Sequence, residues 1–195
     1  MKHSWKIILL PTFCVIGILA LLYVFSGMQK NEAINKDQPI KKGNMEITSS
    51  QFIHEGLIPP IYTCDGQNIS PPLSISGVQE GTKSLVLIMD DPDVPKSIRP
   101  DGIWDHWIVF NIPPETREIP EGKNLSGVPG VGTSGKLAYG GPCPPDREHR
   151  YFFKLYALDT MLGLSEGAKK SEVELAMAGH IVAEALLMGR YDRKR

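Results

Sequence analysis

The sequence predicts a β-rich α+β domain built on packed antiparallel sheets and preceded by one apolar N-terminal segment. Short apolar runs bounded by turn residues recur from residue 45 onward, a pattern typical of strands. The chain contains 19 Gly and 16 Pro, concentrated between Pro59 and Pro145, and so many helix breakers indicate strands and shaped loops. A helical period occurs only near the C-terminal end, so strands come first and a helix last.

Length and charge limit the classes of function. The 195 residues suffice for one domain with a sizeable core and a short segment in front of it. The net charge is -1 and no block of like charge occurs, so no strong field recruits nucleic acid or acidic partners. We therefore expect no nucleic-acid partner.

An uncharged run at residues 7–25 predicts a transmembrane helix. Lys2 and Lys6 precede this run, whose length is about what a helix needs to cross ~30 Å of hydrocarbon. The positive flank places the N-terminus in the cytoplasm and the rest of the chain outside. We expect a single-pass protein of the cell membrane whose domain is extracytoplasmic.

The apolar run has two alternatives to an anchor. A buried core helix would require a domain of ~150 residues to wrap a wholly apolar cylinder, which we disfavour. Cleavage stays open, because Val24-Phe25-Ser26 suits a signal peptidase and would leave a secreted or periplasmic protein. The chain thus divides into an anchor or signal segment at 1–27, a flexible polar tether at 28–44 and a folded domain at 45–195.

Four apolar runs predict the main strands in order. Residues 45–52 alternate weakly. Residues 84–89 are continuously apolar and too short for a buried helix, which favours a central strand. Residues 107–112 and 151–158 are rich in β-branched and aromatic side chains. The Gly-rich stretch at 127–135 predicts irregular structure.

One helix is predicted after the last of these strands. Ser171 followed by Glu174 indicates a capping box, and Gly189 serves as the C-terminal stop. The apolar residues that recur near helical spacing between them are Ala176, Ile181, Ala185 and Leu186. His180 would lie within this helix in a packing or hydrogen-bonding role, and His54 would be a solvated loop residue.

Three carboxylates follow the predicted strand at 84–89. Asp90, Asp91 and Asp93 repel one another unless they are hydrogen-bonded, protonated or paired with a cation. Pro92 and Pro95 hold their backbone. Taken alone, this segment favours a solvated turn in which the Asp side chains cap local amides.

The next strand opens with Trp104-Asp105-His106-Trp107. Alternation places Asp105 and Trp107 on one face and Trp104 and His106 on the other. A lone histidine at a strand start is more often structural than catalytic. The carboxylates expected beside it add weight to a functional role.

A third polar segment surrounds the start of the strand at 151–158. The Gly140-Gly141 step allows backbone amides to converge on an anion. His149 and Tyr151 share a face, whereas Arg150 points away into an ion pair or a packed surface position. Together the three segments predict an anion site made of glycine amides, imidazole and phenol donors, and a carboxylate that orients the histidines.

At these positions the sequence resembles the phosphatidylethanolamine-binding protein family, and most of all its bacterial and archaeal Raf-kinase-inhibitor-like branch. The resemblance runs from about Met45 to about Tyr191, with separated motifs in the right order. The strings that carry it are Tyr62-Thr63-Cys64-Asp65-Gly66, Ser70-Pro71-Pro72-Leu73, Asp91-Pro92-Asp93-x-Pro95, Trp104-x-His106-Trp107, Tyr139-Gly140-Gly141-Pro142-Cys143-Pro144-Pro145 and His149-Arg150-Tyr151.

The resemblance implies a large antiparallel sheet packed on a smaller sheet, with a C-terminal helix. It also implies a pocket for phosphate, acetate or a phospholipid head group, with Pro95 at its rim. Carried over position by position, the ligand-binding residues are Asp91, Asp93, His106, Gly141, Pro142, His149 and Tyr151. We expect no cofactor.

Four positions, at three places in the chain, depart from the pattern of the branch. Ile75 replaces a usual Trp, and Val94 replaces a usual Ala. Arg147-Glu148 replaces a smaller Gly-Thr type step, which would narrow the mouth of the pocket or alter its charge. These departures leave the identity of the ligand open.

Several functions compete, and a binding or regulatory protein is favoured. Related proteins suggest an inhibitor, and an extracytoplasmic domain favours a protease or other envelope enzyme over a kinase as its target. A metal-dependent hydrolase is the alternative, with the candidate ligands Asp91, Asp93, His106 and His149. A nucleophilic hydrolase would need Ser134 or Cys143, and neither lies in a nucleophile elbow. We therefore assign no catalytic residue and no metal.

Two further expectations concern oxidation and pH. Cys14 lies in the apolar run, which leaves Cys64 and Cys143 either as a disulfide or as two free buried thiols. If His106 and His149 donate to a phosphate dianion, affinity falls as they lose protons near pH ~6.5.

Overall fold

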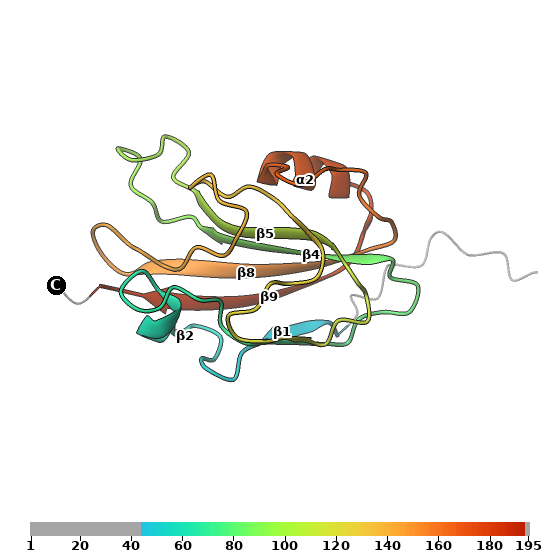
Figure 1. Ribbon diagram of the computed structural model, residues 1–195, viewed down its shortest axis with the longest axis horizontal. Helices are drawn as coiled ribbons and strands as arrows, with labels where there is room; N and C mark the ends of the chain where they lie inside the picture. The colour runs from blue at the N-terminus through green and yellow to red at the C-terminus, as the bar shows by residue number, and fades with distance from the viewer. Residues whose placement is uncertain (1–43, 194–195) are drawn as a thin grey trace, which may run out of the picture. The chain divides into compact units, whose positions relative to one another are not determined.

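A six-stranded sheet packs against a three-stranded sheet in the computed structural model, which describes residues 44–193 (Figure 1). The larger sheet has the spatial order β2 (Gly56–Leu57), β9 (Ile181–Tyr191), β8 (His149–Leu158), β4 (Ser84–Asp91), β5 (Trp104–Ile112) and β7 (Val128–Pro129). The smaller sheet has the order β1 (Glu46–Thr48), β3 (Leu73–Ser76) and β6 (Glu118–Ile119). All neighbours are antiparallel except β2 and β9. The predicted two-sheet architecture is confirmed.

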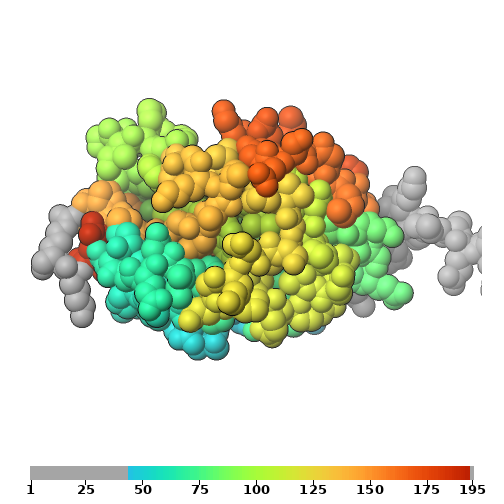
Figure 2. All heavy atoms as spheres, viewed as in Figure 1, coloured from blue at the N-terminus to red at the C-terminus, as the bar shows by residue number. Residues whose placement is uncertain are grey.

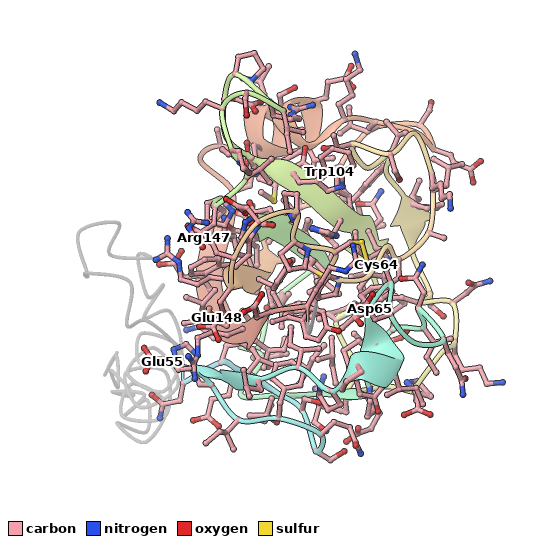
Figure 3. All side chains as sticks on the ribbon, turned by 90° about the vertical axis from the view of Figure 1, so that its left-hand side faces the viewer. Glu55, Cys64, Asp65, Trp104, Arg147 and Glu148 are labelled. Atoms are coloured by element: carbon pink, nitrogen blue, oxygen red, sulfur yellow. A yellow bond between two sulfur atoms is a disulfide. The ribbon has the colours of Figure 1, made fainter. Side chains whose placement is uncertain are left out.

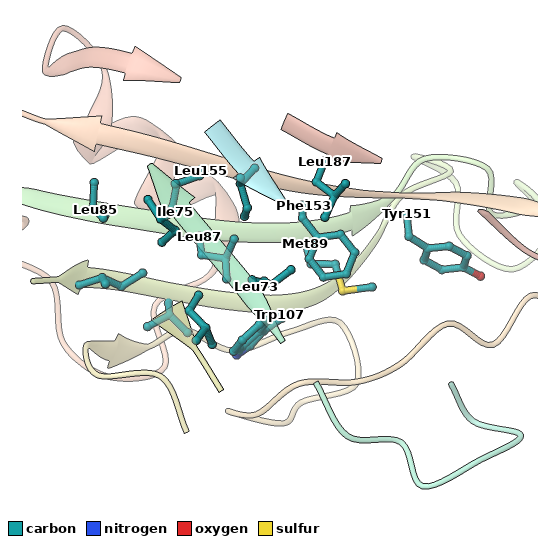
Figure 4. Packing of buried hydrophobic residues seen from close by; sticks show 14 of the residues in the cluster. Leu73, Ile75, Leu85, Leu87, Met89, Trp107, Tyr151, Phe153, Leu155 and Leu187 are labelled. Atoms are coloured by element: carbon teal, nitrogen blue, oxygen red, sulfur yellow. The ribbon is translucent and has the colours of Figure 1, made fainter. Parts of the chain in front are cut away.

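Both faces of the large sheet are covered at β4, whose eight residues are all buried. On one face, Leu85, Leu87 and Met89 pack against the small sheet, and Figure 4 shows this cluster from close by. On the other face, Val86 and Ile88 pack against the helix α2 (Lys170–Met177), which lies opposite β1 in Figure 1. Because β4 is buried on both sides, its sequence is a continuous apolar run and not an alternating one.

The three strongest predicted strands are present. Residues 84–89, 107–112 and 151–158 lie within β4, β5 and β8. The weak signal at 45–52 corresponds to the short β1, followed by a turn. The prediction of irregular structure at 127–135 is wrong for Val128 and Pro129, which pair with Phe110 and Val109 of β5 as an edge strand. An edge tolerates a proline because its missing N–H is not needed there.

The predicted helix from Ser171 to Gly189 is wrong in its extent. Helix α2 ends at Met177, Gly179 adopts a φ of +82°, and the chain returns as β9 along β8. The start also differs: the N–H of Lys169 donates to Glu172 Oε2 at 2.8 Å, so this pair makes the capping contact. The apolar spacing of residues 181–186 is compatible with a helix and with a strand. These residues form a strand because they pair with the edge of β8.

A β-bulge in β5 changes which side chains share a face. Met89 pairs with Trp107 and Asp90 pairs with Asp105, so one residue on β4 faces an extra residue, His106, on β5. Trp107 lies in the core between the sheets, whereas Asp105 lies with Asp90 near Lys170 on the α2 side. The predicted sharing of one face by Asp105 and Trp107 is therefore wrong, because a bulge interrupts the alternation.

Within residues 44–193, no helix is long and apolar enough to cross a membrane. The span predicted at 7–25 lies outside the described residues.

Candidate functional site

A cavity of about 400 Å³ lies where β4 ends and β5 begins, beneath two long loops. One loop follows β2, and the other runs from β7 to β8; they lie side by side in Figure 2. Trp104 and Cys64, which both line the cavity, are labelled at this end of the domain in Figure 3. Of the predicted site residues, Asp91, His106 and Gly141 line the cavity.

His149 lies beneath the cavity floor and is completely buried. Its Nδ1 is 2.7 Å from Asp91 Oδ2, and its Nε2 is 2.8 Å from Asp146 Oδ1. Carboxylate oxygens accept hydrogen bonds, so each ring nitrogen of His149 faces an acceptor. The hydrogen bond from His149 holds the pKa of Asp146 below its usual range. His149 thus bridges two carboxylates and offers no free donor to a ligand.

Asp93 belongs to the outer surface and not to the cavity wall. Its amide donates to Asp91 Oδ1 at 2.8 Å, which fixes the turn after β4. Its carboxylate receives two hydrogen bonds from the Arg150 guanidinium, at 2.8 and 2.7 Å. That arginine holds the pKa of Asp93 below its usual range. Arg150 therefore points away from the cavity, into an ion pair as expected.

His106, like Asp91, is a buried titratable side chain that lines the cavity. Its Nδ1 donates to the Gly140 carbonyl oxygen at 2.7 Å, and its Nε2 makes no hydrogen bond within the described residues. Burial lowers the pKa of His106, although the Gly140 carbonyl and nearby carboxylates act in the opposite direction. The bulge in β5 places this ring against Tyr151, edge to face, with centroids 5.3 Å apart.

Tyr151 supports the same region from β8 and is completely buried. Burial, and less strongly the charge of Asp91, raises the pKa of its hydroxyl far above the ordinary value. The amide of Cys143 approaches this hydroxyl without making a hydrogen bond of good geometry. Tyr151 therefore keeps its proton at any physiological pH.

The two glycine amides do not form the predicted anion nest. The N–H of Gly140 donates to the His106 carbonyl oxygen at 3.0 Å, and the N–H of Gly141 donates to Asn68 Oδ1 at 2.7 Å. A Cβ atom at Gly141 would lie 2.4 Å from the Tyr62 carbonyl oxygen. Close packing between the two loops, not approach to a ligand, therefore requires glycine at 141.

Cys64 and Cys143 are joined as a disulfide with a Cα–Cα distance of 5.4 Å. The bond ties the two loops together, and the Cys64 amide adds a hydrogen bond to the Pro142 carbonyl oxygen at 3.0 Å. Pro142 serves this contact and does not line the cavity. Because its sulfur is bonded to Cys64, Cys143 is not a free nucleophile here.

The candidate metal ligands and the candidate nucleophile can be located in the described part of the chain. Within residues 44–193, no group of three or more His, Cys, Asp or Glu side chains is placed to hold a metal ion. Ser134 lines the cavity, but no hydrogen bond joins it to His106 in the described part of the chain.

The residues that depart from the branch pattern lie in different parts of the fold. Ile75 is buried in the core between the sheets, and Val94 lines the cavity. Arg147 reaches the Asp93 carbonyl oxygen at 3.4 Å, and Glu148 pairs with Arg190 at 2.8 Å. Neither Arg147 nor Glu148 lines the cavity.

Sequence reasoning missed three residues that shape the site. Asn68 adopts a φ of +58°, a conformation that Asn tolerates better than most residues, and its side chain holds Gly141. Tyr139 bonds the Tyr62 carbonyl oxygen at 2.8 Å, which joins the loops again. Asp146 completes the carboxylate pair around His149. The sequence does show that Asp146 lies three residues before His149, and this spacing could have predicted their contact.

Comparison with known proteins agrees with the fold and the motifs. Residues 48–192 match the family model described as phosphatidylethanolamine-binding protein. A UPF0098 protein of Chlamydia trachomatis is 50% identical over 149 residues, which cover 76% of this chain and 99% of that protein. A UPF0098 protein of Methanothermobacter thermautotrophicus is 50% identical over 155 residues, with the same two coverages.

Solved structures show the same architecture. The crystal structure of a putative phosphatidylethanolamine-binding protein homologue from Chlamydia trachomatis has a TM-score of 0.75 at 49% identity, and covers 77% of this chain and 98% of its own. E. coli YbcL, described as a new member of the mammalian PEBP family, has a TM-score of 0.69 at 31% identity, covering 77% and 99%. Both solved chains consist almost wholly of the matched domain. This chain therefore belongs to the phosphatidylethanolamine-binding protein family.

Proposed function

We propose that the protein is a binding or regulatory protein that holds a phosphate-like group, or a phospholipid head group, in the cavity above His106. The observation that carries this proposal is a buried histidine lining a cavity, with one ring nitrogen that has no hydrogen-bond partner among residues 44–193. Buried polar atoms without partners are uncommon in folded proteins, and a bound water, ion or ligand can satisfy such an atom. The walls are mostly apolar, with Val94, Ile98 and Trp104 among them, as in many small-molecule pockets.

Binding without turnover is the form of the proposal that fits the side chains. His149 is held between two carboxylates, and Cys143 is bonded to Cys64. Neither can act as an acid, base or nucleophile without first leaving those partners.

We further propose that the domain acts outside the cytoplasm, tethered through residues 7–25, with an envelope enzyme such as a protease as its protein partner. The uncharged run supports the tether. The disulfide supports an oxidising compartment, where such bonds persist.

A thermal-shift titration of the domain (residues 40–195) with phosphate and phosphoethanolamine tests the pocket. At a hundredfold excess over Kd the ligand stabilises by about 2.7 kcal/mol. For a domain of this size that raises Tm by roughly 5–10 °C. A His106→Ala variant should lose the shift, whereas His180→Ala, an exposed histidine paired with Asp159, should keep it. No shift in the unmodified domain would refute the pocket.

A further inference from the structure

The hydrogen-bonding groups around His106 decide which chemical form of a ligand the cavity accepts. The amides of Gly140 and Gly141 are both occupied, by the His106 carbonyl oxygen and by Asn68 Oδ1. Both oxygens of Asp91 already accept hydrogen bonds from the protein. His106 Nε2 is therefore the buried polar atom that a ligand on the cavity floor would satisfy.

At Nε2 the ring of His106 offers a lone pair and not a proton. Nδ1 faces the Gly140 carbonyl oxygen, which only accepts, so Nδ1 carries the proton of the neutral ring. The charges that act on the ring are those of Asp91 beside the cavity and of Asp90 and Asp105 across the sheet, and Tyr151 lies against the ring from β8. Burial lowers the pKa of His106 more strongly than these carboxylates raise it, which favours the neutral ring near pH 7.

This lone pair discriminates among anions of similar size. Sulfate and a phosphodiester carry only accepting oxygens near neutral pH. Contact with Nε2 would therefore bring two lone pairs together and leave the buried nitrogen unsatisfied. A singly protonated phosphomonoester has one O–H to donate to Nε2. Its other oxygens can accept from the ammonium group of Lys136 on the cavity wall.

We propose that the cavity selects a ligand group that donates a hydrogen bond to His106 Nε2, and that the anion class it takes is the singly protonated phosphomonoester. This inference rests on the proposed function and deepens it by naming the ligand's protonation state. It sets a phosphomonoester apart from the phosphodiester of an intact phospholipid, which has no proton to donate.

Calorimetric titration of residues 40–195 with methyl phosphate, sulfate, dimethyl phosphate and ethanolamine tests the selection. At about pH 5 methyl phosphate should bind about tenfold or more tightly than sulfate or dimethyl phosphate. Its affinity should fall toward about pH 8, because the second proton of a phosphomonoester leaves with a pKa of about 6.

The outcomes separate this inference from the proposed function. Sulfate binding as tightly as methyl phosphate at about pH 5 would show a charged His106 that donates, which overturns the selection but keeps the pocket. Binding of ethanolamine alone would overturn the phosphomonoester assignment. No binding by any of the four would refute the proposed function itself.

A His106→Gln variant gives the converse test. A glutamine amide can place an N–H donor near the position of Nε2, so sulfate should gain affinity relative to methyl phosphate. The matched control is His180→Gln, which should keep the selectivity of the unmodified domain. If His106→Gln proves unstable, the comparison of anions on the unmodified domain still decides.

Discussion

Asp90 and Asp91 are consecutive, almost fully buried carboxylates at the end of β4, and the two faces of the large sheet use them differently. Asp90 faces the α2 side, where Lys154 and Lys170 both donate to its Oδ2. Asp91 faces the cavity side, where His149 and the Asp93 amide donate to it.

Asp90 therefore forms a structural ion pair, whereas Asp91 is a carboxylate held in one position beside the cavity. Lysine ammonium ions are compact point charges on flexible stems, so they neutralise Asp90 without fixing its orientation closely. The imidazole of His149 is rigid and bonded at both nitrogens, so it holds Asp91 in one geometry beside the cavity. The α2 side is thus stabilised by charge, and the cavity side by directed hydrogen bonds.

The largest expected effect follows from removing His149. A His149→Ala substitution leaves Asp91 buried without its histidine partner, which should cost about 3–5 kcal/mol of unfolding free energy. Urea unfolding measures this loss. A loss below about 1 kcal/mol would mean that Asp91 is neutral or hydrated in the folded protein, and would contradict the contrast with Asp90.

The cavity side also has a covalent tie that the α2 side lacks. Reduction of the bond between Cys64 and Cys143, which are 79 residues apart, should cost about 2–4 kcal/mol. It should also weaken ligand binding, since both cysteines line the cavity. Counting free thiols on the unfolded, unreduced protein checks the bond itself, and two reactive thiols from this pair would exclude it.

A smaller effect is expected on the α2 side. A Lys170→Met substitution should cost about 1–2 kcal/mol, less than an unpaired buried charge would, because Lys154 still neutralises Asp90. Burial works against the charge of Lys170, but Asp90 and Asp105 outweigh burial and raise its pKa above the ordinary 10.5. The charge of Lys170 therefore contributes fully to the unfolding free energy below pH 10.5, and this contribution disappears as the pH rises through the raised pKa.

Stability curves against pH give the check for Lys170. The difference in unfolding free energy between the unmodified protein and Lys170→Met should be constant below pH 10.5 and should narrow above it. His106 gives the opposite sign: its lowered pKa means that its contribution is lost as the pH falls below 6.5. A difference for Lys170→Met that persists unchanged in alkali would show that packing, and not charge, is the cause.

Much of the domain was determined by the sequence alone. The runs at 84–89, 107–112 and 151–158 are apolar, β-branched or aromatic, and each lies in a central strand. The motifs identified the family, and they placed Asp91, His106 and Gly141 at one cavity. Local composition and the order of motifs suffice for such features, because each depends on residues close together in the chain.

Tertiary structure decided the rest. Residues 181–186 have a spacing that suits a helix, yet the open edge of β8 made them a strand. The bulge that turns His106 toward Tyr151 appears only when β5 is paired with β4. The sequence predicted that the amides of Gly140 and Gly141 would be available to an anion. In the structure they donate to His106 and Asn68, which lie 34 and 73 residues away in the chain. Hydrogen-bond partners distant in the chain cannot be read from local pattern, and they determine whether a polar group is left for a ligand.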